Sequence, residues 1–221
     1  MRRPQEQRFE EALKAFPAEA QQLLHQLPQR AGRLSSQGVQ SICAAMEVTP
    51  RELALDLLPL ARAFARPEIS GFRVGAVAAS ATDKGETALF LGANLEFPGL
   101  PLHHTIHAEQ AAVVNAWWGE ACRLTALAVS APPCGACRQF LLEAAGDGVL
   151  EILLPAAAAA DEGAPKAACH LVQLEALLPE AFGPGDLGAG GGLFSGRPDQ
   201  ATAPGETGAA EQTIDPLTRA A

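Results

Sequence analysis

The sequence predicts an α/β fold: a sheet that is at least partly parallel, covered by helices on both faces and preceded by a small helical unit. Two observations support this prediction. Residues 1–66 have helical periodicity, whereas the segment after Pro67 changes to short β-type runs that alternate with helical patterns. Strands followed by helices are typical of layered α/β domains. A chain of 221 residues suffices for one main domain with smaller appendages.

The N-terminal segment is expected to form three helices. The first covers residues 9–27, a periodic stretch interrupted only by Pro17. Ser35 and Ser36 can cap the second, and the third opens at Thr49-Pro50. Pro59 is expected to bend the third helix, because proline lacks the N–H that an interior turn uses.

The next segment is expected to hold four strands and two helices. The β-type runs are residues 72–80, 87–95, 124–130 and 149–154, and the helical patterns are residues 107–122 and 134–145. From residue 183 onward glycine, alanine, proline and aspartate dominate, and this composition is typical of a linker.

Composition and charge argue against several classes of function. The formal net charge of −9 speaks against a nucleic-acid track, which needs clustered Lys and Arg. There is no run of about 18 apolar residues that would span a membrane, and the first residues lack the apolar core of a signal peptide. We therefore expect a cytoplasmic protein without a membrane or nucleic-acid partner. Five cysteines, an odd number, favour a reduced compartment and a metal site over a disulfide framework.

The residues that carry chemistry are His107, Glu109, Cys134 and Cys137. Two cysteines three apart at a helix start lie on one face, and a histidine at the start of another helix can complete three ligands to Zn2+. A fourth position is then open for water, and the positive ends of both helix dipoles favour thiolates over thiols. We expect one Zn2+ per subunit. Arg138 either donates hydrogen bonds to the thiolates or is an exposed helix residue.

Glu109 is expected to serve this site as base and proton shuttle. Two thiolates offset the charge of the zinc ion and weaken its acidity, so a nearby carboxylate becomes useful. Glu109 lies in the same first helical turn as His107 and need not bind the metal. The alternative is a structural zinc site closed by Cys122 or His104, which would need no such carboxylate.

Several motifs in a fixed order closely resemble those of cytidine deaminases. They are Phe72-Arg73-Val74-Gly75-Ala76, Gly92-Ala93-Asn94-Leu95-Glu96-Phe97, His107-Ala108-Glu109-Gln110, Pro133-Cys134-Gly135-Ala136-Cys137-Arg138-Gln139-Phe140, and the run at 178–187. The helical N-terminal unit and Leu57-Leu58-Pro59-Leu60-Ala61 resemble the two-domain, homodimeric bacterial class. This resemblance implies a three-layer α/β/α cytidine-deaminase-like fold with a mixed sheet.

The resemblance further implies a nucleoside-binding pocket. Asn94 and Glu96 would hydrogen-bond the ribose 3′-hydroxyl, Phe72 would form part of the wall around the base, and Ala108 and Pro132 would contact the substrate. Glu96 would repel a 3′-phosphodiester, which argues against polynucleotide substrates. On the residues alone, a turn with Asn94 in a left-handed conformation and core packing of Phe72 stay open.

The same resemblance divides the chain into four parts. Residues 1–66 would be the helical N-terminal unit, 67–182 the zinc-dependent catalytic domain, 183–212 the linker, and 213–221 the start of a C-terminal domain that is otherwise lacking. The implied assembly is a homodimer, with a homotetramer as the alternative. Phe182 matches a position that reaches the pocket of a neighbouring subunit.

The expected function is hydrolytic deamination of cytidine and 2′-deoxycytidine in pyrimidine salvage. In this mechanism zinc-bound hydroxide attacks C4 of the pyrimidine, while Glu109 carries the proton to N3 and then to the departing amine. The first alternative is a zinc-binding module or fragment whose catalysis is impaired. The second is a deaminase of bases within nucleic acid, which should have a basic groove and lack the pair of Asn94 and Glu96.

Overall fold

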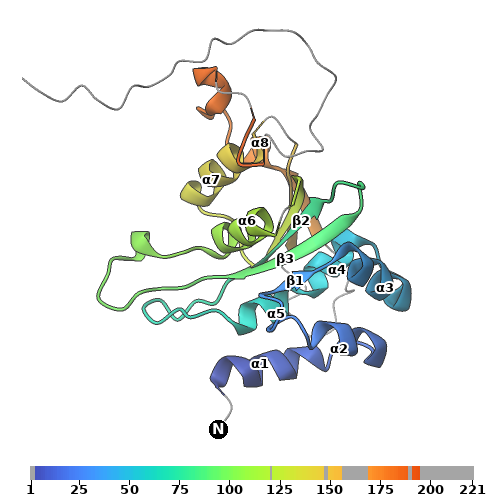
Figure 1. Ribbon diagram of the computed structural model, residues 1–221. Coiled ribbons are helices and arrows are strands. Elements are labelled where there is room, and N and C mark those ends of the chain that lie inside the picture. Colours follow the sequence, from blue (N-terminus) through green and yellow to red (C-terminus); the bar gives the residue numbers. More distant parts are fainter. Residues whose placement is uncertain (1–2, 120, 147–148, 156–168, 189–190, 195–221) are drawn as a thin grey trace, which may run out of the picture.

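A six-stranded sheet lies between two layers of helices in the computed structural model (Figure 1). The structure describes residues 3–119, 121–146, 149–155, 169–188 and 191–194. The predicted α/β fold with helices on both faces of a mixed sheet is therefore confirmed. The predicted start of a further domain at 213–221, and most of the predicted linker, lie outside the described residues. No helix in the described part of the chain combines the length and the apolar character needed to cross a membrane.

The strands follow the order β1-β3-β2-β4-β5-β6 across the sheet. They are β1 (Arg33–Leu34), β2 (Gly75–Ala81), β3 (Thr87–Ala93), β4 (Arg123–Val129), β5 (Glu151–Pro155) and β6 (Cys169–Gln173). Only β4 and β5 pair in parallel among these strands, and the other neighbours are antiparallel. A helix connects β4 to β5, as a parallel pair requires.

Five helices lie on one side of the sheet (Figure 1). They are α1 (Pro4–Leu13), α2 (Ala18–Leu24), α3 (Ser36–Met46), α4 (Pro50–Asp56) and α5 (Leu58–Ala63). Their apolar side chains form one continuous cluster with sheet residues such as Val77, Leu89 and Leu153. The N-terminal helices thus share a core with the sheet.

The predicted first helix over residues 9–27 is divided at Pro17 into α1 and α2, and the ends of α3 and α4 follow the sequence signals. The Ser35 hydroxyl accepts a hydrogen bond from the Gly38 N–H at 3.3 Å and caps α3. The Thr49 and Glu52 side chains form a reciprocal capping box at the start of α4. The sequence predicts a bend at Pro59, but the structure instead begins a separate helix, α5, there. The first turn of a helix does not use the N–H that proline lacks, so proline is accepted at this position.

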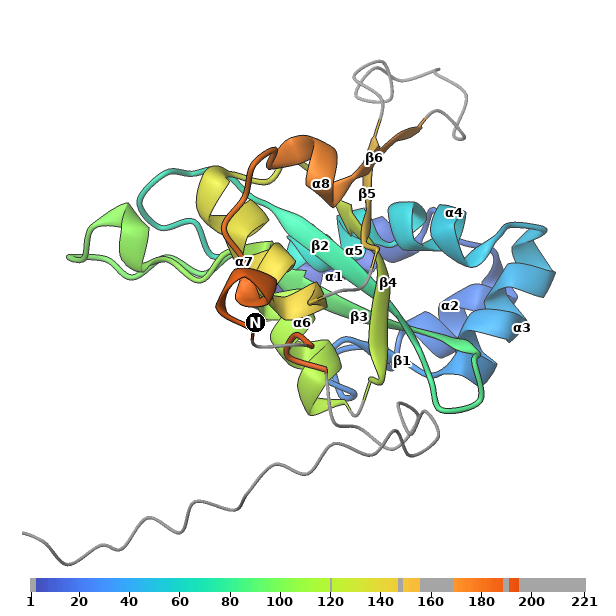
Figure 2. The same ribbon diagram turned by 90° about the horizontal axis from the view of Figure 1, so that it is seen from above.

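The other side of the sheet carries α6 (Ala108–Trp118) and α7 (Gly135–Ala145) (Figures 1 and 2). Both helices contribute to a second core cluster with β2, β4 and β5. Further along lie α8 (Leu174–Leu177) and two 3-10 helices, η1 (Leu102–His104) and η3 (Pro184–Leu187). Strands β1 and β6 and helix α8 were not predicted, since two to five residues are too few for a period to emerge.

Two contacts fix α6 against β3. The Cα of Gly92 faces the backbone of α6, and a Cβ added there would lie 2.8 Å from the Cα of Ala112 and closer still to Ala112 N and Ala108 O. Further along the helix, Asn115 donates hydrogen bonds to the carbonyl oxygens of Ala31 and Leu91 at 2.8 and 3.1 Å. The first contact admits no side chain, and the second ties the helix to the N-terminal segment.

We therefore predict that Gly92→Ala destabilises the protein by about 1–3 kcal/mol, because the new methyl group must push α6 away from the sheet. The matched control is Gly185→Ala, where the added Cβ meets open space and the backbone is not left-handed. Urea unfolding followed by circular dichroism measures both variants. Equal stability of the two variants would contradict the packing argument.

Candidate active site

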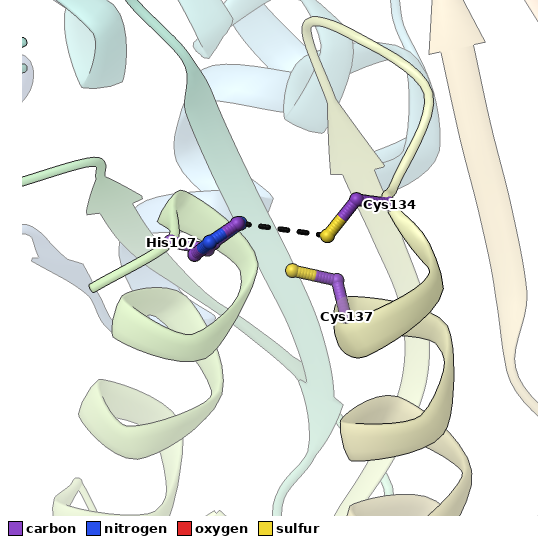
Figure 3. Close-up of side chains that lie close together, drawn as sticks. All are labelled: His107, Cys134 and Cys137. Atoms are coloured by element: carbon purple, nitrogen blue, oxygen red, sulfur yellow. Dashed lines mark hydrogen bonds between the residues drawn. The ribbon is translucent and has the colours of Figure 1, made fainter. Parts of the chain in front are cut away.

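The structure brings His107, Cys134 and Cys137 together between α6 and α7. One ligand atom from each residue lies within 4.8 Å of the others, and the three side chains point toward one another (Figure 3). His107 Nδ1 is 3.7 Å from Cys134 Sγ. A helix and a strand separate His107 from the two cysteines in the sequence, so the tertiary fold brings the histidine to the cysteine pair.

Local structure explains how each residue reaches the cluster. His107 and Cys134 are the N-cap residues of α6 and α7, and both have extended backbone conformations. The Gln110 side chain accepts a hydrogen bond from the His107 N–H at 3.0 Å and so holds the start of α6. Cys137 lies one turn into α7, on the same side as Cys134, and is fully buried.

The donor set fits a tetrahedral zinc ion. With zinc–sulfur and zinc–nitrogen bonds of about 2.3 and 2.05 Å, a tetrahedral site requires these two atoms to lie about 3.6 Å apart. The observed separation of His107 Nδ1 and Cys134 Sγ is 3.7 Å. Neither Cys122 nor His104 belongs to the donor group in the described part of the chain, so the closed four-ligand alternative has no support.

A carboxylate lies beside the cluster without joining it. Glu109 is in the first turn of α6 and only 4% exposed, and it is not among the three grouped ligands. Burial raises the pKa of the Cys137 thiol, and the charges of Glu109 and Cys134 raise it further. Such an accumulation of acidic groups is typical of a site that a cation completes.

A pocket of about 290 Å³ opens over this cluster and collects the predicted site residues. Its lining includes Phe72, Asn94, Glu96, His107, Ala108, Glu109, Pro132 and Cys134. Eight of the nine predicted site residues therefore face one cavity, and the ninth, Cys137, is buried beneath it. Sequence segments from β3, α6 and the turn before α7 meet at this point.

Asn94 and Glu96 are buried, and the described structure uses both to hold the neighbouring segment. The Asn94 side chain accepts from the Val74 N–H at 2.9 Å and donates to the Phe72 carbonyl at 3.0 Å. Asn94 is not in a left-handed conformation, so the simple turn interpretation is wrong. Phe72 is 60% exposed at the pocket, so core packing does not account for it.

Glu96 accepts three hydrogen bonds from two adjacent residues. Its Oε2 atom accepts the N–H groups of Ile69 and Ser70 at 2.7 and 2.8 Å, and Oε1 accepts the Ser70 hydroxyl at 2.6 Å. Burial disfavours the ionised carboxyl, but these hydrogen bonds favour it by more and hold the pKa of Glu96 below its ordinary value. The pocket thus presents a second carboxylate, held without a cation.

Arg138 does not act on the thiolates in this structure. Its guanidinium donates to the carbonyl oxygens of Pro133 and Leu177, both at 2.9 Å. It thereby ties the turn that precedes Cys134 to the end of α8. Both interpretations of Arg138 from the sequence were therefore incomplete, because no local pattern shows which carbonyl groups will lie within its reach.

Two polar residues of the pocket lining, Ser70 and Thr105, were not predicted from the sequence. The Thr105 hydroxyl is buried without a partner among the described residues. Ser70 stands two residues before Phe72 in an exposed segment, where serine is common in any turn. Only its contact with Glu96 distinguishes it.

A second, larger hollow of about 480 Å³ lies between the N-terminal helices. Its polar lining is Glu52 and Asp56, and Glu52 already serves the capping box of α4. This hollow offers neither a nucleophile nor a group of metal ligands. The smaller pocket over His107 is therefore the candidate active site.

Comparisons with known proteins support a family assignment for this arrangement. The family model described as the cytidine and deoxycytidylate deaminase zinc-binding region matches residues 50–154. That span includes every predicted site residue.

Among individual proteins, the chain is 41% identical over 166 residues to a cytidine deaminase of Shewanella baltica, covering 75% of this chain and 50% of the relative. A cytidine deaminase of Shewanella amazonensis is 37% identical over 190 residues, 85% of this chain and 59% of the relative. The chain thus spans about half the length of the curated relatives it matches. A crystal structure of a cytidine deaminase from Burkholderia pseudomallei aligns with a TM-score of 0.45 at 27% identity, covering 59% of this chain and 97% of that one.

If the cluster binds zinc, Cys134→Ser should weaken zinc affinity by more than about 100-fold, since loss of an outer partner alone costs up to that amount. The matched control is Cys169→Ser, because Cys169 is an exposed cysteine on β6. Competition with a colorimetric zinc chelator measures the affinity of each variant. Wild-type affinity in Cys134→Ser would exclude this residue as a ligand.

Proposed function

The chain belongs to the family of cytidine and deoxycytidylate deaminases, and from that premise we propose that it hydrolyses cytidine and 2′-deoxycytidine to uridine and 2′-deoxyuridine. One observation carries the proposal: a zinc-type donor group and a buried carboxylate, Glu109, share a pocket with Asn94 and Glu96. The pocket volume of about 290 Å³ suits a small ligand such as a nucleoside. The net charge of −9 makes a polynucleotide a poor ligand.

His107, Cys134 and Cys137 would hold one zinc ion in each chain. The ion would act as a Lewis acid and lower the pKa of a water molecule, which supplies the nucleophile at neutral pH. The imidazole would bind through Nδ1, the atom that faces Cys134. Two thiolates and the ion nearly cancel in charge, so the site still needs a base.

Glu109 supplies that base in the proposed mechanism. Its carboxylate accepts one proton from the attacking water and delivers it to N3 of the pyrimidine as a bond forms between the water oxygen and C4. Glu109 then carries the second proton of the water to the amino group, and the bond from C4 to nitrogen breaks. Water is consumed, ammonia leaves, and Glu109 returns to its starting state. Burial at 4% exposure keeps bulk water from competing for these protons.

The remaining pocket residues would position the nucleoside. Phe72 stands at the pocket with an exposed ring that can cover one face of the base. Asn94 and Glu96 offer an amide and a carboxylate to a sugar hydroxyl, and Ala108 and Pro132 complete the walls.

We further propose that the enzyme is a cytoplasmic homo-oligomer of pyrimidine salvage, a dimer with a tetramer as the alternative. Exposed apolar side chains support a second copy: Leu102, which lines the pocket, is 49% exposed, and Phe182 is 63% exposed. We also retain as a proposal the division into a helical unit at 1–66, a catalytic domain at 67–182, a linker at 183–212 and the start of a further domain at 213–221.

The function is tested by following deamination of cytidine in the ultraviolet with zinc-loaded protein. Glu109→Gln should lower kcat by about 100- to 10,000-fold, the usual contribution of a general acid–base group, while zinc content stays at the wild-type level. Glu143→Gln, an exposed glutamate on α7, is the matched control and should leave kcat unchanged.

Two outcomes would contradict the proposal. Undiminished turnover in Glu109→Gln would remove Glu109 from the mechanism. Zinc-loaded wild-type protein that leaves cytidine unchanged would refute the enzymatic function of this chain and favour a zinc-binding module without catalysis.

A further inference from the structure

The wall of the pocket formed by residues 66–74 rests on two buried polar side chains. Asn94 and Glu96 are 7% and 4% exposed, whereas Ser70 and Phe72 in the wall are exposed. The backbone of Arg66 pairs with the strand end on both sides, because its N–H donates to Asn94 O at 2.9 Å and its carbonyl accepts from Glu96 N at 3.0 Å. In the described part of the chain, the hydrogen bonds between this wall and the strand end therefore involve Asn94 and Glu96.

The hydrogen-bond capacity of Glu96 is almost exhausted by the wall. An ionised carboxylate has about four acceptor sites, two on each oxygen. The N–H groups of Ile69 and Ser70 occupy Oε2, and the Ser70 hydroxyl occupies one site on Oε1. One acceptor site on Oε1 is left, and Ser70 determines which one.

Within the described structure, Asn94 has one unused hydrogen-bond donor, which complements the free acceptor site of Glu96. Its amide has two N–H donors, and one is used by the Phe72 carbonyl. The other N–H has no partner among the described residues. Asn94 and Glu96 together can therefore serve one group that both donates and accepts a hydrogen bond, and a single hydroxyl is such a group.

We propose that Ser70 is a positioning residue, whose hydroxyl orients the Glu96 carboxylate so that Glu96 and Asn94 bind one hydroxyl of the substrate's sugar. This inference rests on the proposed function. The Ser70 oxygen also accepts the Phe72 N–H at 3.0 Å, so the same serine aligns the residue that faces the base. Ser70 acts through Glu96 and takes no part in the chemical step.

A purely structural role for Ser70 makes a different prediction. If its hydroxyl only held the wall in place, its loss would weaken every nucleoside equally, since each of them uses the wall. If it orients Glu96, the loss affects only nucleosides that carry the hydroxyl in question. The comparison of cytidine with 2′-deoxycytidine and 3′-deoxycytidine separates the two roles.

We expect Ser70→Ala to lower kcat/KM for cytidine by about 10- to 100-fold, the range for a lost hydrogen bond to a charged group. For the deoxy analogue that lacks the bound hydroxyl, the decrease should stay below about threefold, because its wild-type complex never used that hydrogen bond. Ser70→Thr retains the hydroxyl and should restore the wild-type ratio of kcat/KM between cytidine and the deoxy analogue that lacks the bound hydroxyl. Ser36→Ala is the matched control, since it removes a comparable serine–glutamate bond of 2.7 Å, to Glu86, outside the pocket.

Binding of the products provides a readout that does not depend on turnover. Calorimetry on zinc-loaded protein gives dissociation constants for uridine and its two deoxy analogues with wild type and Ser70→Ala. Weaker binding of uridine and of the deoxy analogue that keeps the bound hydroxyl, with the other analogue unaffected, supports the inference. Equal loss for all three, or a wild type that binds them equally, overturns it. Absent turnover in every variant would contradict the proposed function alone, and the binding data would then decide the role of Ser70.

Discussion

The close approach of α6 to β3 at Gly92 is the contact on which the rest of the site depends. The helix backbone at Ala108 and Ala112 lies where any side chain at position 92 would stand. His107 is one residue from this contact along the helix, and Asn94 is two residues from it along the strand. A single backbone contact therefore sets the spacing between the His107, Cys134 and Cys137 group and the buried pair of Asn94 and Glu96. A displaced helix would separate two halves of one site, so packing and function impose the same requirement for glycine here.

Two carboxylates lie buried at this pocket, and the protein stabilises them by different means. Glu96 is held by hydrogen bonds from Ile69 and Ser70, which favour its ionised form against burial. Glu109 is at the start of α6, where the helix dipole favours negative charge, and faces a group of ligands that would carry a cation. The Glu96 carboxylate already accepts three hydrogen bonds from the protein, so it suits a role in holding a ligand in place. The Glu109 carboxylate interacts with the Cys137 thiol, and this position suits the proton-transfer role proposed for it.

One wall of the pocket is exposed, but buried polar side chains hold its backbone in place. Phe72 presents a largely exposed ring, yet its backbone is fixed by hydrogen bonds to Asn94 and Ser70. On the opposite side, Arg138 ties the turn before Cys134 to the end of α8. Both walls are therefore loops held by side-chain to main-chain hydrogen bonds, from Asn94 just after β3 on one side and from Arg138 of α7 on the other. Such construction keeps a site precise while leaving its surface free to contact a ligand.

The sequence alone determined the layered α/β fold, the positions of most helices and strands, and the candidate residues, because periodicity, capping signals and motif spacing are local properties of the chain. Thr49 and Ser35 cap helices as expected. The spacing of His107, Cys134 and Cys137 in the sequence predicted that the three could bind one metal ion, and the structure groups them. Only the tertiary structure decided the order of the strands, the short strands β1 and β6, and the partners of Arg138 and Ser70. These depend on contacts between segments far apart in the sequence, and a serine or an arginine shows no pattern of its own that identifies the distant group it will meet.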